Sequence, residues 1–290
     1  MAAISAKTVK ELREATGAGM MDCKRALADC DGGLEKATTL LRERGLVKAG
    51  KREGRATSEG AIGMVLAGNV GALVDLGCET DFVAMNEKTV ALVTSFAQVV
   101  VDDASIDSVE ALMAAKLNGE PLEEVVKNNI ATIGENLVIR RVERLAVEGS
   151  GSVGGYVHGG KLGVLVGLST DASGAVVDAL AKDLAMHVAA ADPAPVALDR
   201  DGVPSELVEK ERDFLIKQAK DSGKPDNIIE KMVDGRIGKY FSEICLLEQA
   251  FIKDPDQKVK KIVEAAASEA GSGIEIAGFV RVKIGEAAAE

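Results

Sequence analysis

The 290-residue chain is poor in aromatic residues, histidine and cysteine. It contains no tryptophan, and Phe and Tyr make up 3% of its residues, so it offers little for stacking the bases of single-stranded nucleic acid. Two histidines and four cysteines without metal-type spacing indicate neither zinc nor another metal site, and we expect no cofactor. Without a secretory signal, the cysteines are more consistent with reduced thiols than with a disulfide framework.

Long apolar runs are also missing. A run such as Leu162 to Leu168 is far shorter than a membrane span. The first residues, M-A-A-I-S-A-K-T, carry charge where a signal peptide would be apolar. We therefore expect a soluble, cytoplasmic protein that does not contact membranes. With 47% hydrophobic residues, the chain is long enough for one large domain or two to three small ones.

Charge is divided unevenly along the chain. Residues 1–55 hold 12 Lys and Arg against 8 Asp and Glu, whereas the remaining residues hold 23 against 38. The acidic body argues against a nucleic-acid platform, because phosphate binding depends on clustered basic side chains. We expect no stable nucleic-acid binding. Contact of the basic head with RNA stays open, the alternative being a solvated helical surface followed by a basic linker.

An imperfect repeat is the most informative feature that is present. Residues 63–76 and 155–168 are identical at seven of fourteen aligned positions without a gap. Glycines and core-facing positions of a β-hairpin account for the matches. The identical pairs are Gly63/Gly155, Val65/Val157, Gly68/Gly160, Gly71/Gly163, Leu73/Leu165, Val74/Val166 and Leu76/Leu168. The repeat predicts a duplicated fold.

Each copy continues with an apolar helix, a second helix and a closing strand. Hydrophobic spacing places these elements at about 87–101, 122–133 and 137–147 in the first copy, and at about 174–191, 259–270 and 274–284 in the second. Three strands with helices on one face form an α+β unit. The first copy reaches its helix through C-E-T-D-F-V-A-M-N and the second through S-T-D-A-S-G. Function is expected where the copies diverge.

Helical segments flank and interrupt the duplicated core. Residues 4–45 predict three short helices, and the charged, glycine-containing stretch at 48–55 predicts a flexible linker. Two amphipathic segments joined by S-G-K-P predict a helical hairpin inserted at about 196–247. Its apolar stripe needs a partner, either the body or a second copy in a dimer. The predicted domains are 1–55, 56–149 and 150–290.

Several residues stand out before any family is considered. Phe82 lies in a polar strand-to-helix segment and follows no amphipathic period, while Asp81 beside it has the alternative role of a helix N-cap. Of Met20 and Met21, one is expected in the core of the head and the other on its surface, with two core methionines as the alternative. His158 is expected at the tip of the second hairpin.

Enzymatic and adaptor functions are the alternatives to weigh. Cys78, His158 and Asp81 can be drawn as a nucleophile, base and orienting acid, but no family signature surrounds Cys78. The G-S-G-S-V-G-G stretch is not followed by the Lys-Ser/Thr of a phosphate loop. We therefore expect no enzyme. In an adaptor, the three-helix head would bind a disordered or nascent peptide and the core would be a scaffold.

Five ordered motifs carry a resemblance to a known family. They are T-V-K-E-L-R-E-A-T-G-A-G-M-M-D-C-K-R-A-L, C-E-T-D-F-V-A, I-G-E-N-L-V-I-R-R, Y-V-H-G-G-K-L-G-V-L-V and M-H-V-A-A. Together they resemble bacterial elongation factor Ts over nearly the whole chain. The resemblance implies a ubiquitin-associated-like head, a two-subdomain core and a helical hairpin. It also implies a guanine-nucleotide exchange factor that binds elongation factor Tu in its GDP-bound and nucleotide-free states.

The resemblance assigns contact residues in three places. It implies that a magnesium-dislocating loop enters the GTPase, that the head docks on a GTPase helix, and that the second hairpin adds a contact. The loop residues are Thr80, Asp81, Phe82 and Val83, the head residues are Arg13, Met20 and Met21, and the hairpin residue is His158. Some family members continue into a further helix that touches the GTPase, and we expect that contact to be missing because this sequence ends at V-K-I-G-E-A-A-A-E.

Overall fold

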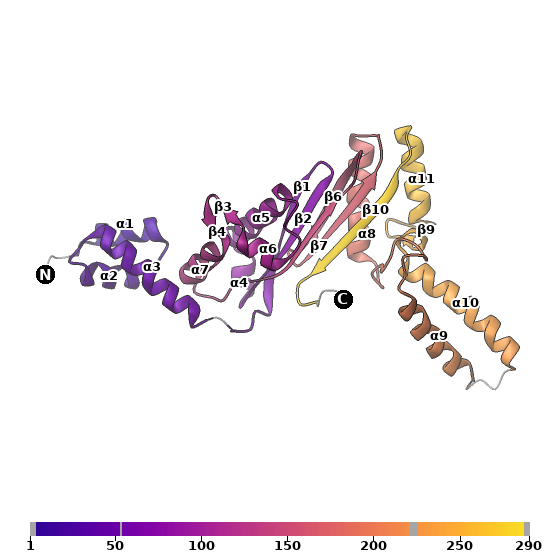
Figure 1. Cartoon of the computed structure of the whole chain (residues 1–290), viewed down its shortest axis with the longest axis horizontal. Helices are drawn as coiled ribbons and strands as arrows, with labels where there is room; N and C mark the ends of the chain where they lie inside the picture. Colours follow the sequence, from indigo (N-terminus) through magenta and orange to yellow (C-terminus); the bar gives the residue numbers. More distant parts are fainter. Residues whose placement is uncertain (1–3, 53, 221–224, 287–290) are drawn as a thin grey trace.

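Two three-stranded sheets lie at the centre of an elongated molecule, between a helical head and a helical hairpin (Figure 1). This is a computed structural model, and it describes residues 4–52, 54–220 and 225–286. The predicted turn at 222–225 and the chain end at 287–290 fall largely outside the described residues. Helices and antiparallel sheets occur together in one chain, so the predicted α+β class is confirmed.

The head consists of three helices, as predicted. They are α1 (Ala6–Thr16), α2 (Met20–Asp29) and α3 (Leu34–Gly50). The side chain of Ser5 accepts a hydrogen bond from the Thr8 amide and so caps α1, which ends at Gly17 in the left-handed conformation with a φ of 67°. A small apolar core joins the helices and includes Val9, Leu12, Cys23, Ala26, Leu27 and Ala37.

The predicted flexible linker at 48–55 is wrong at its start. Helix α3 continues to Gly50 and packs along α7 (Leu122–Ile133) of the body. A Cβ atom on Gly45 would lie 2.7 Å from the Cβ of Ala131, so the missing side chain allows the two helices to approach closely. Beyond α3, the Arg52 guanidinium donates a hydrogen bond to the Ile130 carbonyl at 3.2 Å. The head is thus packed on the body as well as tethered to it.

The first half of the core is an antiparallel sheet covered by helices on one face. Its strands β1 (Glu59–Ala67), β2 (Val70–Cys78) and β5 (Val138–Ala146) are ordered β1-β2-β5. The covering helices are α4 (Asp81–Ala84), α5 (Glu87–Asp102), α6 (Val109–Ala114) and α7. The sequence analysis does not predict α4 beyond the alternative of an N-cap at Asp81, and it does not predict α6 or the small hairpin formed by β3 (Lys116–Leu117) and β4 (Glu120–Pro121).

The second half repeats this arrangement. Its strands β6 (Gly151–His158), β7 (Leu162–Ser169) and β10 (Glu275–Lys283) are ordered β10-β7-β6. Helices α8 (Ala175–Ala190) and α11 (Val259–Ala270) pack against it, and shorter elements connect them: η1 (Leu246–Glu248), β8 (Ala250–Phe251) and β9 (Asp254–Lys258). The predicted helices and closing strands of both copies are confirmed to within one or two residues, and the predicted hairpins are confirmed with first strands that begin four residues earlier, at Glu59 and Gly151.

The uncovered faces of the two sheets pack against each other and form a shared core. Its buried members are Ile62, Leu73, Val147, Val153, Leu165 and Val282. Two backbone hydrogen bonds cross the interface reciprocally: the Ile62 amide donates to the Gly160 carbonyl, and the Val153 amide to the Gly68 carbonyl, both at 2.9 Å. Each hairpin tip therefore binds the first strand of the other half, which is the contact pattern expected of a duplicated fold.

The two hairpin turns differ by one residue, which corrects the gap-free repeat alignment. Gly68 and Asn69 form the first turn, whereas Gly159–Lys161 form the second. The alignment holds along the second strands, but the first strands are offset by one position. Gly63 lies against the backbone of α5, and the glycine that lies against α8 in the same way is Gly154 rather than Gly155.

The inserted helical hairpin is confirmed as α9 (Ser205–Lys220) and α10 (Asp226–Ile244). The two helices bury their own apolar stripe, which includes Leu215, Ala219, Ile229, Val233 and Ile237. At the base, a parallel bridge joins Ala197 to Cys245. The stripe is thus partnered within the hairpin, and dimerisation through this element stays a prediction. None of the helices in the described ranges has the length and apolar character of a membrane span.

Removing the hairpin should leave the core folded, because the insertion interrupts only the second copy. It should also largely spare the nucleotide exchange that the family resemblance implies. Deleting residues 205–242 keeps Ile244, Cys245 and Leu246, which are buried at the base and in the second core. Circular dichroism should show an intact core, and sedimentation should reveal any loss of self-association. If the deletion abolishes activity while the core remains folded, the peripheral role of the hairpin is disproved.

His187 is a buried core residue with both ring nitrogens hydrogen-bonded. The Ile252 amide donates to Nδ1 at 3.2 Å, so Nε2 carries the proton and donates to the Gln249 side-chain oxygen at 2.9 Å. Gln249 in turn donates to the Pro193 and Glu243 carbonyls. Burial lowers the pKa of His187 below its ordinary value of 6.5, although the Gln249 hydrogen bond opposes this.

The depressed pKa of His187 predicts a loss of stability in mild acid. Above about pH 6.5 neither state binds the proton, whereas below it the unfolded chain binds a proton that the folded chain does not. The free energy of unfolding should fall by up to about 1.4 kcal/mol per pH unit from this group. Urea unfolding at several pH values should show a shallower slope for His187→Gln. Equal slopes for both proteins would rule out His187 as the source.

Candidate functional site

The segment between β2 and α5 forms a short helix with a defined cap at each end. The Thr80 hydroxyl accepts a hydrogen bond from the Val83 amide at 3.4 Å and caps α4. The Asn86 side chain accepts one from the Lys88 amide at 2.9 Å and caps α5. Asp81 is the first residue of α4, so the alternative that it is the N-cap is wrong. Capping gives the segment a fixed geometry.

Helix α4 and the residue that follows it, Met85, present two large apolar side chains to solvent. Phe82 is 79% exposed and Met85 is 66% exposed, whereas Ala84 on the opposite side is buried and Val83 is half-buried. Phe82 lies outside the core, as its polar surroundings in the sequence indicate. Met85 is an exposed neighbour that the sequence does not single out, because α4 itself is too short to show a period. Exposed apolar side chains on a rigid frame are typical of a protein interface.

Two motifs that are far apart in the sequence hold this segment together. Glu135 directly follows Gly134, which ends α7 with a φ of 91°. One carboxylate oxygen of Glu135 accepts the amides of Glu79 and Thr80 at 3.1 and 3.0 Å, and the other accepts the Thr80 hydroxyl at 2.7 Å. The Glu79 carboxylate accepts the Asn136 amide at 2.7 Å. The C-E-T-D-F and I-G-E-N motifs therefore form one structural unit.

Arg140 fixes the sheet below this unit. Its guanidinium donates to the buried Asp75 carboxylate at 3.0 and 3.2 Å and to the carbonyls of Thr57 and Glu59 at 2.8 and 3.1 Å. Burial raises the pKa of Asp75, and the charge and hydrogen bonds of Arg140 oppose that rise. One side chain of β5 thus connects all three strands at the edge from which the segment leaves.

Cys78 is not poised as a nucleophile. It is buried, and its thiol donates to the Thr80 carbonyl at 3.1 Å. Burial, followed by the negative charge of Glu135, raises its pKa to about 11, so the thiol stays protonated at neutral pH. The side chain of His158 contacts Tyr156 instead of Cys78. The trio of Cys78, His158 and Asp81 is therefore not assembled.

His158 is exposed at the end of β6, before the tip of the second hairpin. Its Nδ1 atom shares a hydrogen bond of 3.0 Å with the Tyr156 hydroxyl. Because the second turn is one residue longer, His158 corresponds to Ala67 of the first copy rather than to Leu66.

The tip of the second hairpin lies at the same edge of the first sheet as the α4 segment. The Lys161 ammonium contacts the Glu59 carboxylate at 2.6 Å, and Glu59 pairs with Cys78 at the end of β2. The hydrogen bond and charge of Glu59 raise the pKa of Lys161, and the Asp81 carboxylate adds to this effect. The structure therefore brings the predicted loop close to Lys161 at the tip of the second hairpin, while His158 lies beside Tyr156.

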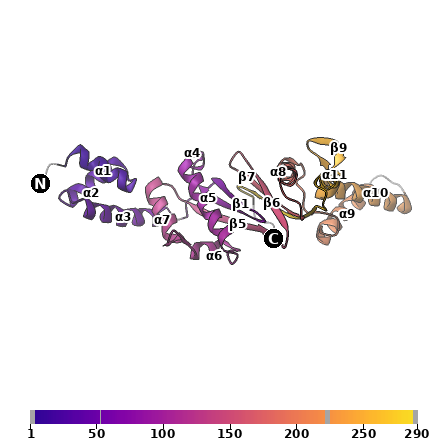
Figure 2. The same ribbon diagram turned by 90° about the horizontal axis from the view of Figure 1, so that it is seen from above.

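The three predicted head residues are all exposed. Met20 is 53% exposed and Met21 is 64% exposed, and Arg13 is also on the surface. The expectation that one methionine fills the core is wrong, because α2 begins at Met20 and turns its core face toward Cys23, Ala26 and Leu27. The head lies at one end of the molecule, away from α4 (Figure 2). A partner that touches both must extend along the long axis.

The comparisons with known proteins agree with these motifs. The family model described as Elongation factor TS matches residues 79–286, so the match begins at the α4 segment. Elongation factor Ts of Magnetococcus marinus is 46% identical over 287 residues, covering 98% of this chain and 93% of its own. The protein of the same name from Hydrogenovibrio crunogenus is 47% identical, covering 98% and 92%.

The chain belongs to the elongation factor Ts family. This is a family of translation elongation factors, so the resemblance carried by the five motifs is confirmed. Elongation factor Ts of Clostridium perfringens, 46% identical over 98% of this chain, extends the likeness to a third genus. The three alignments cover nearly the whole chain, and the head is therefore shared as well as the core.

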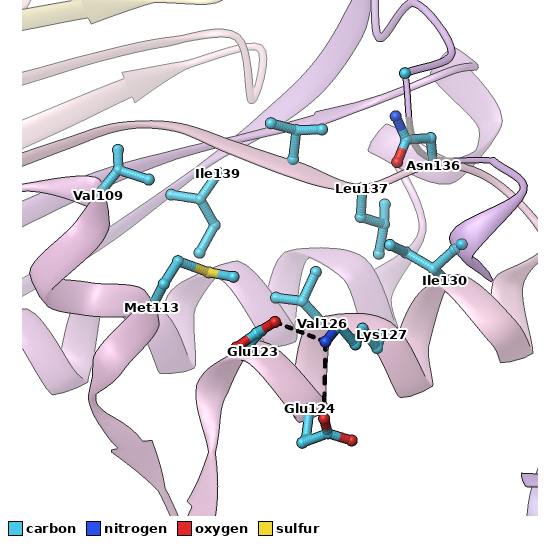
Figure 3. A pocket seen from close by; sticks show the side chains of 13 residues that line it. Val109, Met113, Glu123, Glu124, Val126, Lys127, Ile130, Asn136, Leu137 and Ile139 are labelled. Atoms are coloured by element: carbon cyan, nitrogen blue, oxygen red, sulfur yellow. Dashed lines mark hydrogen bonds and ion pairs between the residues drawn. The ribbon is translucent and has the colours of Figure 1, made fainter. Parts of the chain in front are cut away.

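An apolar cavity lies apart from these residues. It measures about 500 Å³ and is lined mainly by apolar side chains of α6, α7 and β5 (Figure 3). At its rim Lys127 contacts Glu123 at 2.6 Å and Glu124 at 3.8 Å. The predicted contact residues do not line this cavity, and only His158 borders a smaller one, of about 340 Å³, among the cavities described. Met20, Met21 and Phe82 are exposed, so the candidate site is a protein surface. Within the described ranges, no group of His, Cys, Asp and Glu side chains is arranged to hold a metal ion.

Proposed function

We propose that this chain binds elongation factor Tu in the cytoplasm and promotes the release of GDP so that GTP can bind. The observation that carries the proposal is the exposure of Phe82, 79%, on a helix of one turn that is capped at its start and followed by a second cap. An exposed aromatic side chain costs solvation free energy in the free protein. Burial of this side chain by a partner is favourable.

Magnesium coordination explains how such a wedge would act. Mg²⁺ requires near-ideal octahedral geometry and bridges the phosphates of a bound nucleotide. If Asp81 and Phe82 displaced its ligands slightly, Mg²⁺ would bind more weakly, and GDP would therefore bind more weakly as well. Thr80, through its cap, and Val83, through its half-buried side chain, would hold the wedge in position.

The other contacts would supply affinity. Arg13, Met20 and Met21 would dock the head on a helix of the GTPase, where exposed methionines adapt well to a partner. His158 would add a contact near the wedge. No covalent chemistry is required, so the chain acts as an exchange factor rather than as an enzyme, and it leaves when GTP enters.

Linkage gives a quantitative test of this proposal. If the chain lowers the affinity of elongation factor Tu for GDP by some factor, GDP must lower the affinity of elongation factor Tu for the chain by the same factor. Titrations of the chain into elongation factor Tu with and without saturating GDP measure one side, and GDP titrations with and without the chain measure the other. Equal factors well above one are expected. Affinities unaffected by GDP would overturn the proposal.

A further inference from the structure

Glu135 provides acceptors for three donors of the segment that carries α4. Its position is set by Gly134, whose left-handed conformation ends α7 and turns the chain back toward the end of β2. The amides of Glu79 and Thr80 both donate to one oxygen of the carboxylate. Without Glu135, these two amides would lose their acceptor at a half-buried position.

The third bond, from the Thr80 hydroxyl, fixes the cap of α4. A hydroxyl has one proton and two lone pairs. Because the proton points to Glu135 at 2.7 Å, a lone pair is left to accept the Val83 amide. Glu135 thus orients the residue that begins the helix on which Phe82 stands.

A second set of contacts runs in the opposite direction, from the loop after α7 to the side chain of Glu79, and makes the arrangement reciprocal. The Glu79 carboxylate accepts the Asn136 amide at 2.7 Å and lies 3.4 Å from the Arg55 guanidinium. The Asn136 side chain is buried and donates to the Arg55 carbonyl at 2.9 Å. The Glu135 carboxylate therefore accepts the backbone amides of residues 79 and 80, and the Glu79 carboxylate accepts the backbone amide of residue 136. The two loops hold each other in place.

The second copy of the fold is an internal comparison. Helix α11 also ends at a left-handed glycine, Gly271, with a φ of 67°, but Ser272 and Gly273 follow it where Glu135 and Asn136 follow Gly134. We find no hydrogen bond from Ser272 to the segment at 170–173, both of which the structure describes. A polar cavity of about 320 Å³ lined in part by Asp171, Ser272 and Gly273 lies there instead.

The carboxylate and the short helix therefore occur together in one copy and are both missing from the other. In the second copy, S-T-D-A-S-G reaches α8 without a helix equivalent to α4. A purely structural need to close the end of the sheet would apply to both halves. The difference indicates that Glu135 serves the segment that is special to the first half.

We propose that Glu135 is a positioning residue that holds the α4 segment in the geometry required for nucleotide exchange. This inference rests on the proposed function, because it concerns how Phe82 is presented to elongation factor Tu. Glu135 itself need not touch the partner. Its role is to keep the wedge ordered before binding, so that the binding step does not have to order it.

The kinetics of GDP release distinguish a positioning role of Glu135 from a role in binding elongation factor Tu. The head would still capture elongation factor Tu, so the chain concentration that gives half-maximal GDP release should change less than about threefold in Glu135→Ala. The maximal rate at saturating chain should fall at least about tenfold, because hydrogen bonds to a charged acceptor are lost. Glu135→Gln keeps the size of the side chain and part of its hydrogen-bond acceptor capacity, so the maximal rate of GDP release should fall less in this variant. Ser272→Ala, the matched position of the second copy, should leave both parameters unchanged.

Hydrogen exchange in the free chain gives a second readout that needs no partner. The amides of Glu79, Thr80 and Val83 should exchange at least about tenfold faster in Glu135→Ala, while amides of β2 keep their protection. The Gln variant keeps the side-chain volume and serves if the Ala variant does not fold. If the maximal release rate is unchanged in folded Glu135 variants, or if it falls equally in Ser272→Ala, the inference is wrong. If the intact chain itself does not accelerate GDP release, the proposed function fails, and the exchange rates of the three amides still decide whether Glu135 orders the segment.

Discussion

Replacing Phe82 with alanine is expected to slow catalysed GDP release at least about tenfold while the melting temperature barely moves. An aromatic side chain buried by a partner typically contributes roughly 2 to 4 kcal/mol, whereas a merely exposed side chain contributes roughly 0.5 kcal/mol or less to stability. Because Phe82 is 79% exposed, its truncation leaves no cavity in the folded chain. The effect should therefore be confined to the interaction with elongation factor Tu.

The chain offers a matched control for this prediction. Phe214 on α9 is another exposed phenylalanine, at 59%, and it lies on the hairpin far from α4 (Figure 1). Phe214→Ala should leave GDP release unchanged. Asp81→Ala should have a smaller effect than Phe82→Ala. A Phe82→Ala protein that unfolds early and exchanges normally once cooled would show that Phe82 acts in the core and that the wedge mechanism does not apply.

Removing the head is expected to weaken capture of elongation factor Tu at least about a hundredfold. Two anchoring side chains at about 2 kcal/mol each account for a loss of this size. The body should stay folded, because the buried clusters of both sheets contain no residue of the head. Cutting before Lys51, rather than after Arg55 as the predicted domain boundary suggests, keeps the hydrogen bonds of Arg52 and Arg55 to the body.

Point variants distinguish the contact itself from the presence of the head. The double variant Met20→Ala and Met21→Ala should lose much of the affinity, measured by titration, with little change in melting temperature. Val47→Ala is the control, because Val47 is 62% exposed on α3. If the truncated chain captures elongation factor Tu as tightly as the intact one, the head does not supply affinity.

Most of the fold could be predicted because the sequence contains two copies of the same pattern. The two hairpins, the helices after them and the closing strands follow from the repeat at 63–76 and 155–168 and from hydrophobic spacing. The offset between the first strands could not be seen, because the gap-free alignment pairs Gly68 with Gly160, which stand at different places in turns of different length. Turn length depends on backbone conformation, here the positive φ of Gly159 and Gly160.

Glycine also explains why the linker prediction failed. Gly50 and Gly54 within a charged stretch suggest a flexible linker when they are taken as local signals. In the structure, Gly45 is the point where α3 approaches Ala131 of α7. A local pattern does not show that the missing side chain serves a contact with a helix more than 80 residues away.

The candidate site was partly accessible from sequence. The exposure of Phe82 follows from its polar surroundings, but the roles of Thr80 as cap and of Met85 as exposed neighbour depend on α4, which has only four residues. Glu135 lies in I-G-E-N-L-V-I-R-R, one of the five motifs that carry the resemblance, yet its acceptor role depends on donors 55 and 56 residues away. Long-range side-chain hydrogen bonds leave no periodic signal in the chain.

The most direct test of the account is the release of fluorescent GDP from elongation factor Tu, followed in real time while the intact chain is added at increasing concentration. We expect the release rate to rise with chain concentration to a plateau well above the spontaneous rate, with a mass measurement confirming a complex that lacks nucleotide. A complex that forms with no acceleration of GDP release would contradict the account and would favour the adaptor, in which the head binds a peptide and the core is a scaffold.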